Sequence, residues 1–305
     1  MSGVSGVLGS VGTTVRRRYR ALRTSRKVAA FCANPLNVVG LALVVAIAVA
    51  AAVGPFIAPY DPTTQQLTNR LQHPSLAHPL GTDQLGRDVL SRLLHGARLS
   101  LSIAVAVTGI RLTLGTTIGL LAGYAGGWTD EFLMRLVDVQ LAFPGLVLAL
   151  VIAGILGPSL RNVMLALALV GWASYARLVR GTVLTTKERN FVRAARLLNV
   201  SRFRIATRHL LPTVAGPVVV LATLNMGTVI LGTAGLSFIG LGAQPPTAEW
   251  GTMLSDGRHH LRSAWWIANV PGVAIMLTVL GFTLLGDGLR DVLDPKRDAT
   301  IEKLS

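Results

Sequence analysis

The stretch LNVVGLALVVAIAVAAAVGPFIA, residues 36–58, is the clearest indication of the class of fold. It has no charged side chain, and about 20 helical residues suffice to cross the roughly 30 Å hydrocarbon core of a bilayer. A basic tail precedes it, as in a signal peptide, but the apolar part of a cleavable signal is only about 7–15 residues long. We therefore predict a retained transmembrane helix at Leu36–Ala58.

The rest of the chain has the same character. Of 305 residues, 51% are hydrophobic and 14% are charged, whereas soluble domains carry about 25% charged residues. Further apolar spans run approximately over Leu99–Tyr124, Phe132–Leu156, Asn162–Val183, Thr213–Leu241 and Ile267–Leu285. We predict an all-α polytopic membrane protein with six transmembrane helices.

The basic residues indicate the orientation of these helices. The tail holds the run RRRYRALRTSRK, residues 16–27. If it is cytosolic, six crossings place both termini in the cytosol, and cytosolic segments hold about 21 basic residues against about 7 elsewhere. This bias explains the net charge of +15 without a nucleic-acid partner. The predicted organisation is a cytosolic tail 1–35, the helix 36–58, an extracytosolic loop 59–98, a core 99–290 with a cytosolic loop 186–212, and a cytosolic tail 291–305.

The cytosolic loop contains FVRAARLLNVSRFRIATRHLLP, residues 191–212, which is rich in arginine and lacks an acid. We expect two short helices, Phe191–Leu198 and Arg202–His209. Asn199 would end the first in a left-handed conformation, and Ser201 would cap the second. Two small alanines ringed by arginines suggest a knob that enters a groove of another protein. A basic loop lying on anionic lipid headgroups is the alternative.

This loop resembles the cytosolic coupling loop of ABC-importer permeases. The family pattern of Glu-Ala-Ala, a later Gly and a Leu-Pro falls on Arg193-Ala194-Ala195, Asn199 and Leu211-Pro212, so Arg replaces the acid and Asn the glycine. The resemblance implies contact with an ATPase subunit through Arg193, Ala194, Ala195, Leu198, Asn199 and Arg202. Reversal of the charge at Arg193 puts the usual ion pairing in doubt.

Four longer motifs narrow the family. They are HPLGTDQLGRDVLSRLLHGARLSL (78–101), GYAGGWTDEFLMRLVD (123–138), GLSFIGLGAQPPTAEWGTML (235–254) and GDGLRDVLDPK (286–296). Together they resemble the C-type permease subunits of dipeptide, oligopeptide and nickel importers, over nearly all of residues 34–296. The resemblance implies a type I ABC-importer permease fold (MetI-like) and import of peptides or related small solutes, with nickel import as the alternative.

The resemblance also implies partners. The sequence has no Gly-x-x-x-x-Gly-Lys-Ser/Thr motif and so lacks the phosphate cradle that binds ATP. We expect a non-catalytic subunit without a cofactor of its own, with ATP and Mg on partner chains. The family's assembly adds a second permease, two ATP-binding subunits and an extracytosolic solute-binding protein, and the resemblance implies that this chain itself lies in the bacterial inner membrane. A secondary transporter or a membrane enzyme would need embedded acids, clustered nucleophiles or metal ligands.

Three polar positions in the apolar spans are candidates for the translocation pathway. Arg111 lies near the middle of the second span, where charges usually face a bundle interior or an aqueous cavity. It is expected to face the pathway or the partner permease, or alternatively to bind backbone carbonyls at a helix interface. Asn225 and Thr228, in the fifth span, are the other two candidates.

Several smaller patterns carry alternatives. Asp83, Arg87 and Asp88 either staple their loop through ion pairs or contact the binding protein. His73 and His78 lack a third ligand and make a weak metal site, so no metal site is predicted. The glycines at 115, 119, 123 and 127 favour close helix packing over a pore-lining role. Arg135 is expected to pair within its helix with Glu131 and Asp138.

Overall fold

The structure is a computed structural model that describes residues 28–293; the predicted tails fall largely outside this range. Five helices are long and apolar enough to cross a membrane, or six if one bent pair counts as a single span. They are α2 (Pro35–Ile57), α3 (Val89–Ala125), α6 (Leu160–Thr186), α9 (Leu211–Phe238) and α11 (Trp266–Leu293). The described chain thus confirms the all-helical membrane fold.

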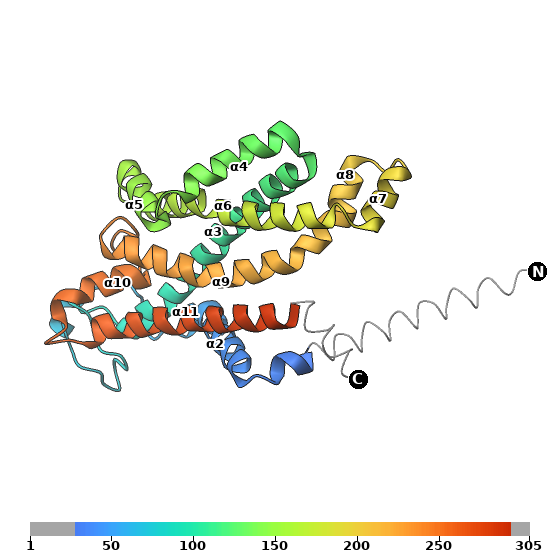
Figure 1. Cartoon of the computed structure of the whole chain (residues 1–305). Helices are drawn as coiled ribbons and strands as arrows, with labels where there is room; N and C mark the ends of the chain where they lie inside the picture. Colours follow the sequence, from blue (N-terminus) through green and yellow to red (C-terminus); the bar gives the residue numbers. More distant parts are fainter. Residues whose placement is uncertain (1–27, 294–305) are drawn as a thin grey trace, which may run out of the picture.

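Shorter elements lie at the two ends of this bundle (Figure 1). At one end are α7 (Asn190–Leu197) and α8 (Arg202–Ile205), and at the other is α10 (Trp250–Gly257). Short 3-10 turns occur at Leu67–Asn69 and Arg258–His260. We call the end of the bundle with α7 and α8 the α7 end, and the end with α10 the α10 end.

The α3–α6 interface depends on glycine. A Cβ atom on Gly115 or Gly119 would collide with the backbone of α6, and one on Gly123 would lie 2.9 Å from Val183 Cβ. Three of the four predicted glycines therefore serve close helix packing. Gly127 does not, because it begins the next helix with φ of 56° and a Cβ there would meet open space.

The third predicted span is not one straight helix. It is divided into α4 (Gly127–Leu141) and α5 (Gly145–Leu156), which meet at an angle of 86°. The break falls at Pro144, whose ring disfavours the helical conformation of Phe143 before it and removes a hydrogen-bond donor. Gln140 fixes the end of α4, because its Nε2 donates to the carbonyls of Leu169 and Val170 at 2.6 and 2.5 Å.

The second predicted span begins earlier than expected. Helix α3 starts at Val89, because the Asp88 carboxylate accepts a hydrogen bond from the Ser91 amide at 2.7 Å and caps the first turn. The polar motif before residue 99, predicted as loop, is therefore partly the first turns of α3.

Helix α8 continues into α9 without a break. Between them lies a π-helical turn, Ala206–Leu210, in which the Leu211 amide donates to the Ala206 carbonyl five residues back. Pro212 follows and has no N–H to donate, and a π-turn is one way in which a helix absorbs such a missing bond. The segment Arg202–Phe238 is thus one helix of 37 residues.

Candidate functional site

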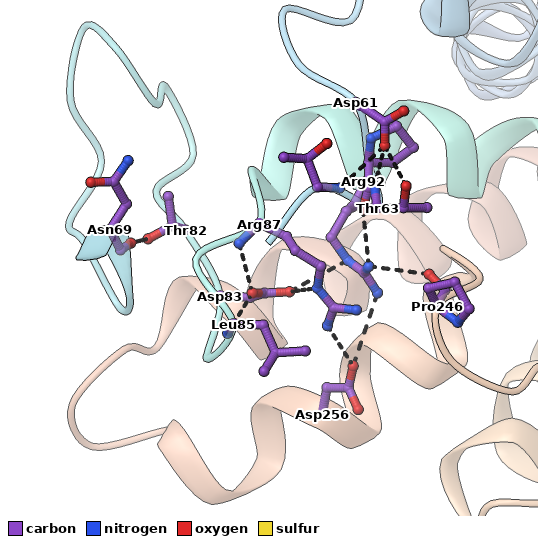
Figure 2. A network of polar contacts seen from close by, with 12 residues as sticks. Asp61, Thr63, Asn69, Thr82, Asp83, Leu85, Arg87, Arg92, Pro246 and Asp256 are labelled. Carbon is purple, nitrogen blue, oxygen red and sulfur yellow. Dashed lines mark hydrogen bonds and ion pairs between the residues drawn. The ribbon is translucent and has the colours of Figure 1, made fainter. Parts of the chain in front are cut away.

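The α10 end contains a buried network of charged side chains (Figure 2). Asp83 Oδ2 accepts from Arg87 Nε at 2.6 Å and lies 3.6 Å from Arg92 Nε. Asp256 of α10 lies 3.4 Å from Arg87 Nη2, so the network joins the loop before α3 to α10. The side chains of Asp83, Arg87 and Arg92 are only 2–4% exposed. Two acids and two bases balance, as burial of charge requires.

Neighbouring contacts extend this staple. Arg92 Nη1 donates to the carbonyls of Pro62 and Pro246 at 3.2 and 3.5 Å, which ties two further loops to α3. Asp88 Oδ1 pairs with His78 Nδ1 at 2.9 Å. Trp266 Nε1 donates to the Thr82 carbonyl at 3.1 Å and fixes the same loop to α11.

These positions correct one sequence prediction. Asp83, Arg87 and Asp88 are 3%, 2% and 3% exposed, so their side chains are not accessible to a separate binding protein. The stapling alternative describes them instead. Burial depends on partners distant in the sequence, such as Asp256, and the local motif does not reveal them.

The two histidines of the same loop make separate contacts. His78 pairs with Asp88, while the ring of His73 lies 4.7 Å from that of Trp266, measured between centroids. Within residues 28–293 there is no group of three His, Cys, Asp or Glu side chains that could hold a metal ion.

Arg111 lies between α3 and α6. Its Nε and Nη2 donate to the Leu167 carbonyl at 2.8 and 2.6 Å, and the residue is 7% exposed. Gly171 makes room for it, because a Cβ there would collide with the guanidinium. This geometry is that of the interface alternative, in which the charge binds a backbone carbonyl.

The other two pathway candidates form a pair on α9. Thr228 is exposed, and its Oγ1 donates to the Asn225 carbonyl at 2.9 Å. The Asn225 side chain lies 3.3 Å away through Oδ1, and the residue is half-buried. Both residues therefore lie on a polar edge of α9 near its middle.

At the α7 end, the local predictions on the arginine-rich segment are confirmed. Asn199 follows α7 with φ of 54°, the left-handed conformation expected of a helix stop. Ser201 accepts at its side chain from the Arg204 amide and caps α8. The two helices and the turn between them form a compact hairpin beside the end of α6 (Figure 1).

The orientation of α7 corrects the predicted knob. Ala194 is exposed, but Ala195 is 7% exposed and packs into a hydrophobic cluster with Val183, Val192 and Ile205. Only Ala194 of the two can enter a groove of another protein. The outer surface also includes Arg193, Leu197, Leu198, Asn199 and Arg202.

Arg193 has an internal partner that sequence reasoning missed. Its Nη2 donates to Glu188 Oε2 at 2.8 Å, and both side chains are more than half exposed. This hydrogen bond lowers the pKa of Glu188 below its usual value, with smaller contributions from the charges of Arg193, Arg196 and Lys187. At this position the family pattern has an acid. Here Arg193 stands in its place and forms an ion pair with Glu188 of the same chain.

Two further ion pairs link α4 to α6. Arg180 binds Asp130 through Nε and Nη2 at 2.5 and 2.7 Å. Arg177 Nη2 donates to Asp138 Oδ1 at 2.5 Å, so Asp138 pairs across helices and not with Arg135 as expected. The signal available in the sequence was the pair of arginines three residues apart inside an apolar span.

Comparison with known proteins agrees with this architecture. Residues 115–299 match the family of binding-protein-dependent transport system inner membrane components, and residues 26–74 match the N-terminal transmembrane domain of oligopeptide transport permease C. In solved structures, a chain of the methionine ABC transporter MetNI has a TM-score of 0.55 at 17% identity, covering 66% of this chain and 95% of that one. That likeness supports the fold.

Curated relatives are closer in sequence. The dipeptide transport system permease protein DppC of Alkalihalophilus pseudofirmus is 47% identical over 264 residues, 86% of each chain. The glutathione transport system permease protein GsiD of Pectobacterium atrosepticum is 45% identical over 242 residues, 79% of this chain and 80% of the relative. The chain therefore belongs to the binding-protein-dependent transport system inner membrane component family and is a multi-pass permease subunit of an ABC importer in the bacterial inner membrane.

Proposed function

We propose that this chain forms half of the membrane pathway of an ATP-driven importer of di- or oligopeptides or related small solutes. The observation that carries the proposal is the 47% identity to a dipeptide permease over 86% of both chains. The glutathione permease relative also handles a short peptide by its name. Both names favour a peptide substrate over nickel.

The proposed orientation places the α7 end in the cytosol and the α10 end outside. The α7 end carries a cluster of basic residues, and basic residues near helix ends concentrate on the cytosolic side of membrane proteins. The cluster comprises Lys187, Arg189, Arg193, Arg196, Arg202, Arg204 and Arg208. A solute-binding protein would then dock at the α10 end.

The surface of α7 and α8 is the proposed docking site for an ATPase subunit. Leu197, Leu198 and Phe203 are 85%, 78% and 78% exposed, and arginines surround them. An exposed apolar patch with a polar rim marks a protein interaction surface. Ala194 and Arg193 lie on the same outer face, so the small side chain and the charge belong to this surface. ATP and Mg would bind on the partner, because this chain lacks the phosphate-binding motif.

The substrate is tested with the whole transporter. The chain is reconstituted in proteoliposomes with a second permease, two ATPase subunits and the solute-binding protein. We expect ATP-dependent uptake of a radiolabelled dipeptide and no accumulation of Ni²⁺. Uptake of either solute by this chain alone would contradict a role that depends on ATPase partners.

The docking surface is tested by co-purification of the ATPase subunits. Leu198→Ser combined with Phe203→Ser should weaken co-purification, and Arg193→Glu should do so until a facing acid on the ATPase is reversed. Leu76→Ser is the matched control, since Leu76 is fully exposed at the opposite end. Unchanged co-purification together with weaker binding to anionic vesicles would favour the lipid alternative.

A further inference from the structure

The ion pair between Asp138 and Arg177 is unusual for its position. The two side chains are 58% and 55% exposed, although Asp138 Oδ1 and Arg177 Nη2 are only 2.5 Å apart. Helix α6 has 27 residues and is about 40 Å long, and Arg177 lies about 6 Å past its midpoint at Ala173. A hydrocarbon core of roughly 30 Å centred on this helix would therefore include the pair.

An exposed ion pair at this depth is incompatible with contact to lipid tails. Charged groups within the hydrocarbon region face a bundle interior or a water-filled cavity, because lipid offers no hydrogen bonds. The exposed side of Asp138 and Arg177 must therefore contact water or polar groups in the assembled transporter.

The surroundings on α6 favour water. Ser174, Gly181 and Thr185 are exposed and lie three to four residues from Arg177 or from each other, so they share one face of the helix. A Cβ on Gly181 would meet no atom within 4 Å, so the face is open there. This strip of small and polar residues extends from the middle of α6 toward the α7 end.

The adjoining helix holds the carboxylate in place. Val137 of α4 packs on Ala173 and Ala176 of α6, which places the next residue, Asp138, at the edge of the contact. Gln140 binds two carbonyls of α6 directly before the 86° bend. The position of Asp138 is therefore fixed by packing, and its exposure is a property of the fold.

The pair also has unused hydrogen-bonding capacity. Asp130 and Arg180, closer to the α7 end, bind each other through two hydrogen bonds and are 16% and 34% exposed. Asp138 and Arg177 share one hydrogen bond, so within the described chain the second carboxylate oxygen and the remaining guanidinium N–H groups make no further side-chain hydrogen bond. A carboxylate can bind an ammonium group, and a guanidinium can bind a carboxylate.

We propose that Asp138 and Arg177 line a water-filled pathway and form a binding station for a zwitterionic solute. The ammonium end of the solute would pair with Asp138 and its carboxylate end with Arg177. The inference rests on the proposed peptide import and adds a specific site to it. A free peptide carries these two charges at its ends, whereas a bare metal cation carries no carboxylate.

Water access is tested with single cysteines in the assembled transporter. Ser174→Cys and Gly181→Cys are made in a Cys32→Ser background, since Cys32 is the one native cysteine. A charged, membrane-impermeant thiol reagent should modify both, and saturating dipeptide should slow the reaction. Val45→Cys is the control, because Val45 is a half-exposed apolar residue of α2 and should stay unmodified. Absence of labelling at both α6 positions would place the pair in a dry subunit interface and overturn the proposal.

Solute binding is tested by dipeptide uptake. Asp138→Asn and Arg177→Gln should each lower uptake roughly tenfold, the ratio expected for loss of one charge-assisted hydrogen bond. Asp130→Asn is the matched control and should affect uptake less, because Asp130 is bound within the chain. ATP hydrolysis stimulated by the binding protein should persist in all three, which separates loss of the station from loss of assembly.

A charge-exchanged pair distinguishes a binding station from a staple. Asp138→Arg with Arg177→Asp keeps an ion pair but exchanges its ends, and uptake should stay low. Full recovery of uptake would show that only the α4–α6 link matters and would overturn the proposal. If the unaltered transporter takes up no dipeptide while thiol labelling still occurs, the peptide function fails and the water-filled pathway stands.

Discussion

Two regions of this permease subunit treat charge in opposite ways. At the α10 end, Asp83, Arg87 and Arg92 are only 2–4% exposed and each has at least two partners. Between α4 and α6, within the candidate membrane spans, Asp138 and Arg177 are more than half exposed and share one hydrogen bond. Charge is thus buried at one end of the bundle and exposed near the middle of a candidate membrane span.

The difference separates structural from functional charge. A buried network with balanced acids and bases holds loops together, and removal of one member leaves an uncompensated charge. An exposed pair contributes little to stability, so its place at membrane depth needs another reason. The burial of a charged side chain, its partners and its position along the membrane span together indicate whether its role is structural or functional.

The largest expected effect comes from breaking the buried network. Asp83→Leu removes the acid that lies between Arg87 and Arg92 and should destabilise the α10 end by about 3–5 kcal/mol. Thermal unfolding of the detergent-solubilised transporter should show a clearly lower midpoint. Asp256→Asn should cost less, since Asp256 is 27% exposed. Equal stability of Asp83→Leu and the unaltered chain would end the structural interpretation.

A middle case is the buried charge of Arg111, whose guanidinium hydrogen bonds in the described chain all go to the Leu167 carbonyl. Gly171→Ala should push the guanidinium off the Leu167 carbonyl and loosen α3 from α6, with a cost of about 1–3 kcal/mol for overpacking. Arg111→Met should restore part of this loss, because a flexible side chain can avoid the new methyl group. The thermal midpoints of Gly171→Ala, Arg111→Met and the double variant give the coupling energy between the two positions. Additive losses would show that Gly171 serves another contact.

The two alanines of α7 allow the same comparison of a buried with an exposed residue, here for apolar side chains. Ala195→Phe should lower the yield and thermal stability of the assembled complex, because Ala195 packs against Val192 and Ile205 and a larger side chain there costs about 1–3 kcal/mol. Ala194→Phe should leave stability unchanged and weaken ATPase docking. Reversed outcomes in thermal scans and co-purification would mean that α7 turns its other face outward in the complex.

The smallest effect is expected at the exposed pair of Glu188 and Arg193. The pKa of Glu188 lies below its usual value, so the pair is intact at neutral pH and is lost only as the pH falls through that lowered pKa. Glu188→Gln should therefore leave the thermal midpoint nearly unchanged between pH 6 and 8. A pH-dependent midpoint in that range, abolished by the substitution, would show that the pair does more than hold an exposed arginine.

The sequence predicted the features that depend on local chemistry. Helix α2 was expected at 36–58 and lies at Pro35–Ile57, because uninterrupted apolarity is sufficient to define it. The left-handed Asn199 and the Ser201 cap follow from residue type and position. The bend before α5 was missed although Pro144 signals it, since the flanking apolar residues read as one span.

Features that depend on distant neighbours could not be predicted. Nothing near Asp138 in the sequence identifies Arg177 as its partner, and the i, i+3 spacing suggested Arg135 instead. Likewise, Ala194 and Ala195 look alike until the packing of α7 on the α6 end determines which one faces inward. The exposure of a charged side chain or a methyl group depends on tertiary packing. This exposure determined which of the predicted residues belong to a candidate site.

The unbroken helix from Arg202 to Phe238 has a mechanical consequence. At 37 residues it is about 55 Å long, and it joins the arginine-rich surface to the centre of the bundle without an intervening loop. A push on α8 is therefore passed to α9 through one continuous rod. The π-turn at Ala206–Leu210 is the point of greatest compliance, since tightening it to α-helical geometry shifts the register by one residue. That shift is a twist of about 100° and a travel of about 1.5 Å between α8 and α9, so the same rod can deliver torque as well as force.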